Sequence, residues 1–288
     1  MTPTTQNPII LYHANCTDGM GAAFAAWKYF GEEAKYIPVQ YGQPMPVEIT
    51  EGKDEYIFMV DFSYSREVIE SLRTRHKRVI VIDHHKTAEA ELAGLTDCVF
   101  DMKKSGAVLA WEYFHQTVTR NVEVPTILLH VQDRDLWNWE MENTREICLG
   151  LMQLKTFKEW DNARAHTLFE QGLALAKYID DKVDSASKEE RVLLKPLTKH
   201  SKVRAGIVNT TDNVSEICAA IIKKHGVDVG VGYFVDNQMM AIVSLRSDRN
   251  SEVDVSEFAK KYGGGGHKSA AGCKMTMQQL QELLYMDF

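Results

Sequence analysis

The segment VIVIDHH, residues 79–85, decides how this chain folds. Four apolar residues run directly into an aspartate and two histidines, and such a run predicts a strand buried on both faces of a sheet. Two segments upstream, YIFMVDF at 56–62 and IILY at 9–12, have the same form. Helical patterns cover residues 18–30 and 66–75, and a further predicted strand covers 36–39. Strands that alternate with helices in this way predict a doubly wound α/β domain with a mainly parallel sheet.

The rest of the chain predicts a helical segment followed by a second, smaller α/β domain. Residues 124–191 show helical patterns with little strand signal, and charged residues dominate the end of that stretch. Further strands are predicted at 203–208, 229–235 and 239–246, and further helices at 215–225, 255–262 and 277–285. We therefore predict a catalytic domain over residues 1–155, a helical linker over 156–195 and a smaller α/β domain over 196–288.

Composition excludes several classes of protein. Hydrophobic residues make up 44% and charged residues 25%, which is typical of a globular chain and not of a disordered one. No apolar run approaches the roughly 18 residues of a membrane span, so we expect no membrane partner. The N-terminus lacks the basic start of a secretory signal. The 5 cysteines are scattered without a Cys-X-X-Cys pair, which favours a reducing compartment and a cytoplasmic protein.

The net charge of −7 is unevenly distributed. Residues 1–194 are strongly acidic, whereas residues 195–288 are slightly basic. An acidic N-terminal portion is a poor surface for long duplex DNA, whose phosphates need basic patches, so we expect no such partner. It suits a site in which carboxylates hold cations.

Polar side chains follow several predicted strands where each strand ends. They are His13, Asn15 and Asp18 after the first strand, Asp61 after YIFMV, and Asp83, His84 and His85 after VIVI; Asp133 and Asp135 end a helical run at 126–132. Ligands of open α/β sheets bind outside the carboxyl ends of the strands, so we expect these groups to converge. Imidazole with carboxylate suits a divalent ion such as Mn²⁺, and one or two ions could occupy such a site. Asp18 or Asp61, taken alone, could instead be a helix N-cap.

A run of four glycines, residues 263–266, marks a second candidate site directly before His267. Consecutive glycines allow positive φ, and their amides can form a nest for an anion. A flexible linker is the alternative. Because the run opens directly after a helix, we predict a structured anion pocket that includes Gly265, Gly266 and His267. Arg246, at the end of a strand, could grip a phosphate there.

Two further features have both a structural and a functional interpretation. Ser105 precedes a helix, where it could cap the helix or present amides to a phosphate; we favour the cap and keep Ser105 as a substrate-binding candidate. Trp137 and Trp139 follow Asp135 closely. Core or interdomain packing is favoured for them over base stacking.

These motifs together resemble the DHH phosphoesterase superfamily. Its N-terminal motifs match Asp83-His84-His85, Asp61 and the segment from His13 to Asp18-Gly19. Its DHH-associated C-terminal domain matches Ser244–Ser247, Asp254–Ser256, Gly263–His267 and Ala270–Gly272. The resemblance covers nearly the whole chain, and the nearest branch is that of the oligoribonuclease (nanoRNase) and cyclic-nucleotide phosphodiesterase-like members. It implies two domains joined by a helical linker, with the active site in the cleft between them.

The resemblance also implies roles for individual residues. Asp61 would bridge two metal ions, His13 would bind one ion, and Asp18, His84 and one aspartate of 133–135 would bind the other. We favour Asp133 over Asp135 because it comes first after the helical run. Asp83 would ligate or orient, His85 would touch the scissile phosphate, and Arg246 and His267 would hold the far phosphate or the nucleotide.

One position departs from the family pattern. Many members carry two aspartates, two positions apart, in the first motif; here Asp18 matches the second and Cys16 stands where the first belongs. One metal would then keep His13 and Asp61, with Asn15 or Cys16 as further candidates. We expect a weaker first site or single-metal loading. A Cys-Xaa-Asp-Gly form occurs in this branch, so inactivity does not follow.

The sequence therefore predicts a metal-dependent phosphodiesterase in which a metal-bound hydroxide attacks the phosphorus. Its expected substrate is a short single-stranded oligonucleotide or a small cyclic or linear nucleotide. A pyrophosphate or polyphosphate hydrolase, and a non-catalytic nucleotide sensor or sequestering protein, are the alternatives. A processive DNA exonuclease is disfavoured because no additional nucleic-acid-binding domain is visible. The oligomeric state stays open, a homodimer included.

Overall fold

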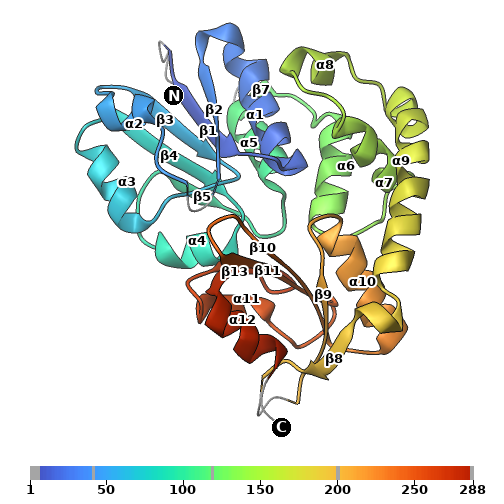
Figure 1. The fold of residues 1–288 in the computed structure, drawn as a ribbon. Helices are drawn as coiled ribbons and strands as arrows, with labels where there is room; N and C mark the ends of the chain where they lie inside the picture. The colour runs from blue at the N-terminus through green and yellow to red at the C-terminus, as the bar shows by residue number, and fades with distance from the viewer. Residues whose placement is uncertain (1–6, 41–42, 118–119, 199–201, 286–288) are drawn as a thin grey trace. The chain divides into compact units, whose positions relative to one another are not determined.

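The computed structural model describes residues 7–40, 43–117, 120–198 and 202–285, and the chain divides into two compact units, residues 1–176 and 177–288. Figure 1 labels most elements of both units. The strands of the first unit are β1 (Ile9–His13), β2 (Lys35–Val39), β3 (Tyr56–Val60), β4 (Arg78–Asp83), β5 (Cys98–Phe100), β6 (Gln116–Thr117) and β7 (Arg120–Asn121). Its helices are α1 (Thr17–Phe30), α2 (Val47–Glu51), α3 (Arg66–Arg73), α4 (Lys86–Glu91), α5 (Gly106–His115), α6 (Thr126–Asp135), α7 (Thr144–Leu151) and α8 (Phe157–Asn162).

The main sheet of the first unit has the strand order β2-β1-β3-β4-β5, and every pairing in it is parallel. Side chains alternate between its two faces. Ile10, Phe58 and Ile80 pack with α1 and α5 in one apolar core, whereas the neighbouring Ile9 and Ile57 pack on the other face with residues of α2 and α3. The predicted doubly wound α/β fold is confirmed.

The strand order of this sheet reverses between β1 and β3. From β1 the chain passes to β2 on one side, and later to β3 and β4 on the other. At such a switch point the loops that leave two neighbouring strands diverge, and they open a crevice at the carboxyl ends of the strands. The topology therefore fixes where a ligand site belongs.

A long helix, α9 (Ala165–Ala186), spans the division between the two units. The stretch predicted as a linker, 156–195, holds α8, α9, a 3₁₀ turn at Glu189–Arg191 and most of β8 (Leu193–Pro196). The predicted boundaries at 155 and 195 stay predictions. None of the described helices, α9 included, combines the length and the apolar character that a membrane span requires.

The second unit is built on a mixed six-stranded sheet in the order β12-β13-β11-β10-β9-β8. Its further elements are β9 (Arg204–Asn209), α10 (Val214–His225), β10 (Val229–Val235), β11 (Met240–Ser247), α11 (Val255–Lys260), β12 (Gly265–His267), β13 (Ala270–Thr276) and α12 (Met277–Leu284). One core lies between the sheet and α11 and α12, and a smaller one forms against α10. The predicted second α/β domain is present, and part of the glycine run forms strand β12.

Candidate active site

The site lies at the carboxyl ends of β1, β3 and β4, on both sides of the switch point. His13 ends β1, Asp61 directly follows β3, and Asp83 ends β4. Asp61 is 1% exposed, and its amide donates to the carbonyl of Ile82 at 3.0 Å. Its φ is +54°, in the left-handed region that aspartate tolerates better than most residues. This conformation turns the chain sharply where the strand stops.

His84 is the centre of a group of carboxylates. Its Nε2 lies 3.1 Å from Oδ1 of Asp61 and 3.3 Å from Oδ2 of Asp18, and all three side chains are almost completely buried. Oδ2 of Asp135 lies 3.6 Å from the same nitrogen, with 27% of that side chain exposed. Four elements far apart in the sequence thus deliver acidic or imidazole groups to one point.

The N-terminus of α5 holds the carboxylate of Asp18. The amides of Gly106 and Ala107 donate to its two oxygens at 2.6 and 2.9 Å. Free amides and the helix dipole favour a negative charge at this end of a helix. Ser105 is fully buried and caps α5 by accepting from the amide of Val108. The capping interpretation of Ser105 is favoured, because the first amides of the helix bind Asp18.

Asp83 organises the two histidines that follow it. Its Oδ1 accepts from the amide of His84 at 2.7 Å and lies 2.7 Å from Nδ1 of His85. The His85 ring is thereby oriented by a carboxylate that is itself fully buried. On the other side of the site, Nδ1 of His13 lies 3.8 Å from Oδ2 of Asp61.

The prediction that Asp133 faces the site, in preference to Asp135, is corrected by the structure. Helix α6 does not end at Gln132 but continues through Asp135. Two residues apart in a helix differ by about 200° in direction, so the two aspartates face opposite sides. Asp133 turns away and accepts from the amides of Glu140 and Met141, whereas Asp135 reaches His84.

Burial and mutual repulsion shift the pKa values of the site. Burial, together with the neighbouring Asp61, raises the pKa of Asp18. Desolvation in the crowded site and repulsion from Asp18 raise the pKa of Asp135 to about 7. Burial also acts on Asp61, but the neighbouring imidazoles of His13 and His84 outweigh it and hold its pKa below the ordinary range. Burial lowers the pKa of His84, but its hydrogen bonds to Asp18 and Asp61 outweigh this and raise it well above the ordinary value.

The donor set fits a divalent cation. Buried Oδ2 atoms of Asp61 and Asp83 have no hydrogen-bond partner among the described residues, and such atoms are costly unless a ligand satisfies them. Three groups of ligand atoms, each within 4.8 Å, share Asp61: His13 with Cys16, Asp18 with His84, and Asp83 with His85. Carboxylate with imidazole suits Mn²⁺ and related ions.

Cys16, which belongs to the first of these groups, is in its protonated thiol form. Burial, followed by repulsion from Asp61 and Asp135, raises the pKa of Cys16 well above its ordinary value. A protonated thiol is a poor metal ligand. Whether Cys16 joins His13 and Asp61 as a ligand stays a prediction.

In the second unit, Arg246 and His267 lie in one row of the sheet. Each is paired with Ala270 of β13, from opposite sides, so their side chains leave the same face. Nε of Arg246 donates to Oγ of Ser215 at 3.1 Å. Their predicted role in substrate binding stays a prediction.

The glycine run packs tightly against β13. A Cβ on Gly264 would lie 2.1 Å from the carbonyl oxygen of Gly272, and Gly266 has φ +138°. The amides of Gly263 and Gly264 donate to carbonyls of α11, so they do not belong to an anion nest. The flexible-linker alternative is not supported, and a predicted pocket would use Gly265, Gly266 and His267.

Comparison with known proteins agrees with this geometry. The DHH family N-terminal domain matches residues 8–132, and the DHHA1 domain matches residues 200–286. The chain belongs to the DHH phosphoesterase superfamily. The predicted family and the predicted phosphoesterase activity are thereby confirmed, and the DHH match contains His13, Asp18, Asp61 and the motif of residues 83–85.

Two curated relatives align with nearly the whole DHH chain. Uncharacterized protein R106 of Acanthamoeba polyphaga mimivirus is 28% identical over 295 residues, which cover 93% of this chain and 67% of that protein. Oligoribonuclease NrnB of Bacillus subtilis is 27% identical over 300 residues, which cover 92% and 72%.

Two solved structures are more distant. An uncharacterized protein from Helicobacter pylori G27 has a TM-score of 0.45 and 15% identity, over 98% of this chain and 99% of that one. The pGpG-specific phosphodiesterase PggH from Vibrio cholerae has a TM-score of 0.45 and 12% identity, over 96% and 95%.

The sequence did not reveal two contributors to this DHH site. Gly106 donates to Asp18, and a Cβ at this position would lie 2.5 Å from Cβ of Asp61. Gln132 accepts from the amide of Ser105 through Oε1 at 3.1 Å. A Ser-Gly pair at the start of a helix was the available signal for the first, whereas nothing local marked Gln132.

Proposed function

We propose that this protein is a divalent-metal-dependent phosphodiesterase that hydrolyses short single-stranded oligonucleotides or small nucleotides. Family membership makes the chain a phosphodiesterase-type hydrolase. The observation that supports the finer proposal is the convergence of Asp18, Asp61 and His84, with unpartnered buried oxygens beside them. The printed activity of the Bacillus relative, an oligoribonuclease, supports short RNA as the substrate class.

We assign the metal to the carboxylates around His84. Asp61 would be the shared ligand, with Asp18, His84 and Asp135 on one side and His13 on the other. Mn²⁺ is the favoured ion because imidazoles and carboxylates are mixed in this set. A bound ion of this type supplies an activated water and neutralises negative charge on the phosphate oxygens.

The chain's own residues position the reactants. The amides of Gly106 and Ala107 fix the Asp18 carboxylate, so this ligand needs no reorganisation when substrate arrives. Asp83 fixes the ring of His85 through Nδ1. We assign His85 to the scissile phosphate, because it is the least buried member of the Asp-His-His motif, with 17% of its side chain exposed. Burial of Asp18, Asp61 and His84 keeps bulk water away from these three ligands.

The setting of the activity follows from composition. Two observations support a cytoplasmic enzyme. The cysteines are free and scattered, and the chain is similar to the oligoribonuclease NrnB of Bacillus subtilis. The acidic N-terminal portion disfavours a long duplex as a partner. Arg246 and His267 would bind the distal part of the substrate.

The test is product analysis with Mn²⁺ on short RNA, long RNA, a cyclic dinucleotide and polyphosphate, beside a chelator control. Asp61→Asn is the informative variant, because asparagine keeps the shape and tolerates the left-handed backbone. Asp54→Asn is its matched control, since Asp54 has the same φ of +54° but is exposed on the surface. We expect cleavage of short RNA that needs Mn²⁺, that Asp61→Asn abolishes, and that Asp54→Asn leaves unchanged.

Three outcomes would overturn this proposal. Cleavage that persists in Asp61→Asn would remove the shared ligand from the mechanism. Release of phosphate from polyphosphate alone would identify a phosphoanhydride hydrolase in its place. Full activity in the presence of a strong chelator would exclude the metal.

A further inference from the structure

Two tryptophans directly after the acidic helix have an unusual backbone conformation. Trp137 has φ +59° and Trp139 has φ +58°. A bulky residue in the left-handed region is strained, and such strain persists only where the surrounding structure enforces it. Strained residues of this type gather at functional sites, so the pair requires an explanation.

Asp133 enforces this conformation. Its carbonyl accepts from the amides of Asn138 and Trp139. Its carboxylate accepts from the amides of Glu140 and Met141, and from the hydroxyl of Thr144 at 2.6 Å. A single buried residue thus holds the second half of the loop between α6 and α7, through its carbonyl and its carboxylate. The loop that carries the two indole rings is therefore held in one conformation.

The two rings do not serve an apolar core. Among the described residues, neither tryptophan belongs to any of the buried apolar clusters. Trp139 is 36% exposed, although tryptophan is highly buried on average. The rings contact each other edge to face, with centroids 4.8 Å apart and planes at 76°. In an edge-to-face pair each ring covers at most one face of its partner.

The chain tethers the pair to the carboxylate cluster. Trp137 is two residues after Asp135, which limits their Cα separation to about 7 Å, and Trp139 lies within about 14 Å. Asp135 itself lies 3.6 Å from His84. The chain itself therefore keeps both tryptophans near the carboxylate cluster.

We propose that Trp137 and Trp139 form a subsite that stacks a nucleobase of the substrate beside the metal cluster. The inference rests on the proposed function for the identity of the substrate, and it deepens that function by naming what selects a nucleotide. Stacking suits any base, because every base has an aromatic face. The enzyme should therefore distinguish nucleotides from base-free phosphodiesters, with little preference among sequences.

Binding is tested with adenosine 5′-monophosphate and ribose 5-phosphate, two ligands that differ only in the base. Intrinsic fluorescence is recorded with Mg²⁺ on the full chain. We expect adenosine 5′-monophosphate to quench the fluorescence and to bind at least about tenfold more tightly than ribose 5-phosphate. In Trp139→Leu this difference should vanish, whereas Trp139→Phe should keep part of it.

Trp27→Phe is the control, because Trp27 stacks on Phe24 and Phe157 away from the carboxylates. It should lower the total fluorescence but keep the quenching by adenosine 5′-monophosphate. Circular dichroism confirms that each variant is folded. If ribose 5-phosphate binds wild type as tightly as adenosine 5′-monophosphate, or if Trp139→Leu keeps the difference, the subsite does not exist.

Hydrolysis separates this inference from the proposed function. The substrates are a dinucleotide and the same molecule without its bases. We expect Trp139→Leu to raise KM for the dinucleotide by about tenfold and to leave the base-free substrate unchanged. An equal loss on both substrates would assign the pair a structural role and overturn the subsite. If wild type cleaves neither substrate but still prefers adenosine 5′-monophosphate in the binding test, the proposed function fails while the stacking site stands.

Discussion

Asp133 and Asp135 lie two positions apart in α6 and have opposite tasks. Asp133 is buried among the amides of the following loop, and Asp135 turns to His84. The sequence predicted Asp61, Asp83 and His84 from their place after strands, because a strand end fixes a direction. It could not separate Asp133 from Asp135, because that choice depends on where α6 ends.

The two aspartates should therefore respond differently to the loss of charge. Asp135→Asn should weaken Mn²⁺ binding by roughly 10- to 100-fold and leave the unfolding midpoint near wild type. Asp133→Asn should lower the free energy of unfolding by about 1–3 kcal/mol, because charge-assisted hydrogen bonds to buried partners are lost. Calorimetric titration with Mn²⁺ and urea unfolding of both variants measure this. Stronger loss of Mn²⁺ binding in Asp133→Asn would restore the order predicted from the sequence.

Cys16 offers a test of the departure from the family pattern. Cys16→Asp should tighten Mn²⁺ binding at the His13 side, since it adds a carboxylate to His13 and Asp61. It should also lower the unfolding temperature without metal, because a further negative charge enters the acidic cluster. Electron paramagnetic resonance of Mn²⁺ counts the bound ions. Cys16→Ala is the control and should leave the count unchanged; a lower count would make the thiol a ligand.

At the scale of an element, helix α5 contributes both to the packing of the unit and to the candidate site. Its first residue, Gly106, packs against Asp61 and donates to Asp18, so the helix start is a wall of the site. The sequence predicted most strands and most helices to within a few residues, because apolar periodicity and strand-end polar residues were clear. It did not predict β5, or β8, which begins inside the predicted helical linker. The close approaches of glycines were not predictable, since they depend on which two elements meet.

Gly106→Ala should damage the site through Asp61. The added Cβ would lie 2.5 Å from Cβ of Asp61, and we expect at least about tenfold weaker Mn²⁺ binding together with a loss of stability of about 1–3 kcal/mol. Gly150→Ala is matched, because its Cβ would meet the carbonyl of Leu168 at 2.3 Å in the packing of α7 on α9. That variant should lose similar stability but bind Mn²⁺ normally. Equal Mn²⁺ binding in the two variants would argue against the role of Gly106.

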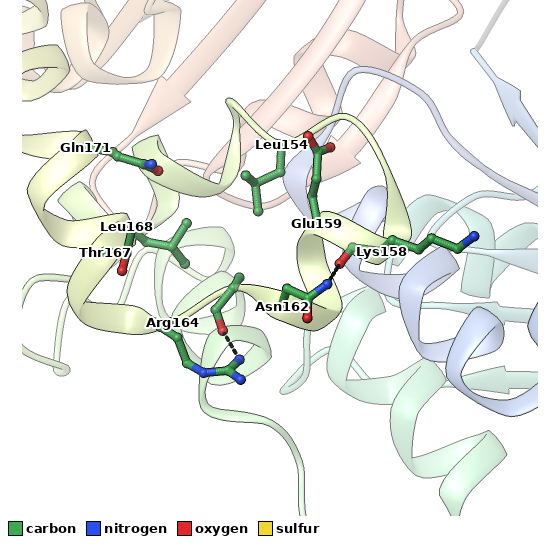
Figure 2. Close-up of a pocket in the computed structure, with 9 residues that line it drawn as sticks. Leu154, Lys158, Glu159, Asn162, Arg164, Thr167, Leu168 and Gln171 are labelled. Atoms are coloured by element: carbon green, nitrogen blue, oxygen red, sulfur yellow. Dashed lines mark hydrogen bonds between the residues drawn. The ribbon is translucent and has the colours of Figure 1, made fainter.

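The first unit also contains a hollow remote from the carboxylates. It measures about 330 Å³ and lies among α8, the start of α9 and the residues before α8, with Leu154, Leu168 and Gln171 in its lining (Figure 2). The side chains of Arg164 and Asn162 donate hydrogen bonds to backbone carbonyls there.

Binding of Mn²⁺ to the first unit should stabilise the whole molecule against unfolding. Mn²⁺ at about 100 times its Kd contributes about 2.7 kcal/mol, which for a chain of this size raises the unfolding temperature by about 5 °C or more. Hydrogen exchange should slow most at the ends of β1, β3 and β4 and at the start of α5. Asp61→Asn should abolish both effects. An equal rise in temperature in that variant would place the bound ion elsewhere.

The architecture of the whole chain was predictable because its two motif sets are independent and occur in the expected order. The alternation of strands and helices gave the parallel sheet, and the second set gave a second α/β unit. The predicted limits of the linker stay predictions, and α9 continues without interruption across the division at 176. Charge and helical periodicity change gradually along it.

The left-handed turn at Asp61 also restricts how this lineage can vary. Position 61 has to be filled by a residue that accepts φ +54° and supplies a carboxylate, and among the acidic residues aspartate is much the better suited. Glutamate has the chemistry without the conformational tolerance, and asparagine has the tolerance without the charge. Selection for activity from a library randomised at this codon should return aspartate alone. Substitution at position 61 is therefore not tolerated, even where neighbouring positions accept other residues.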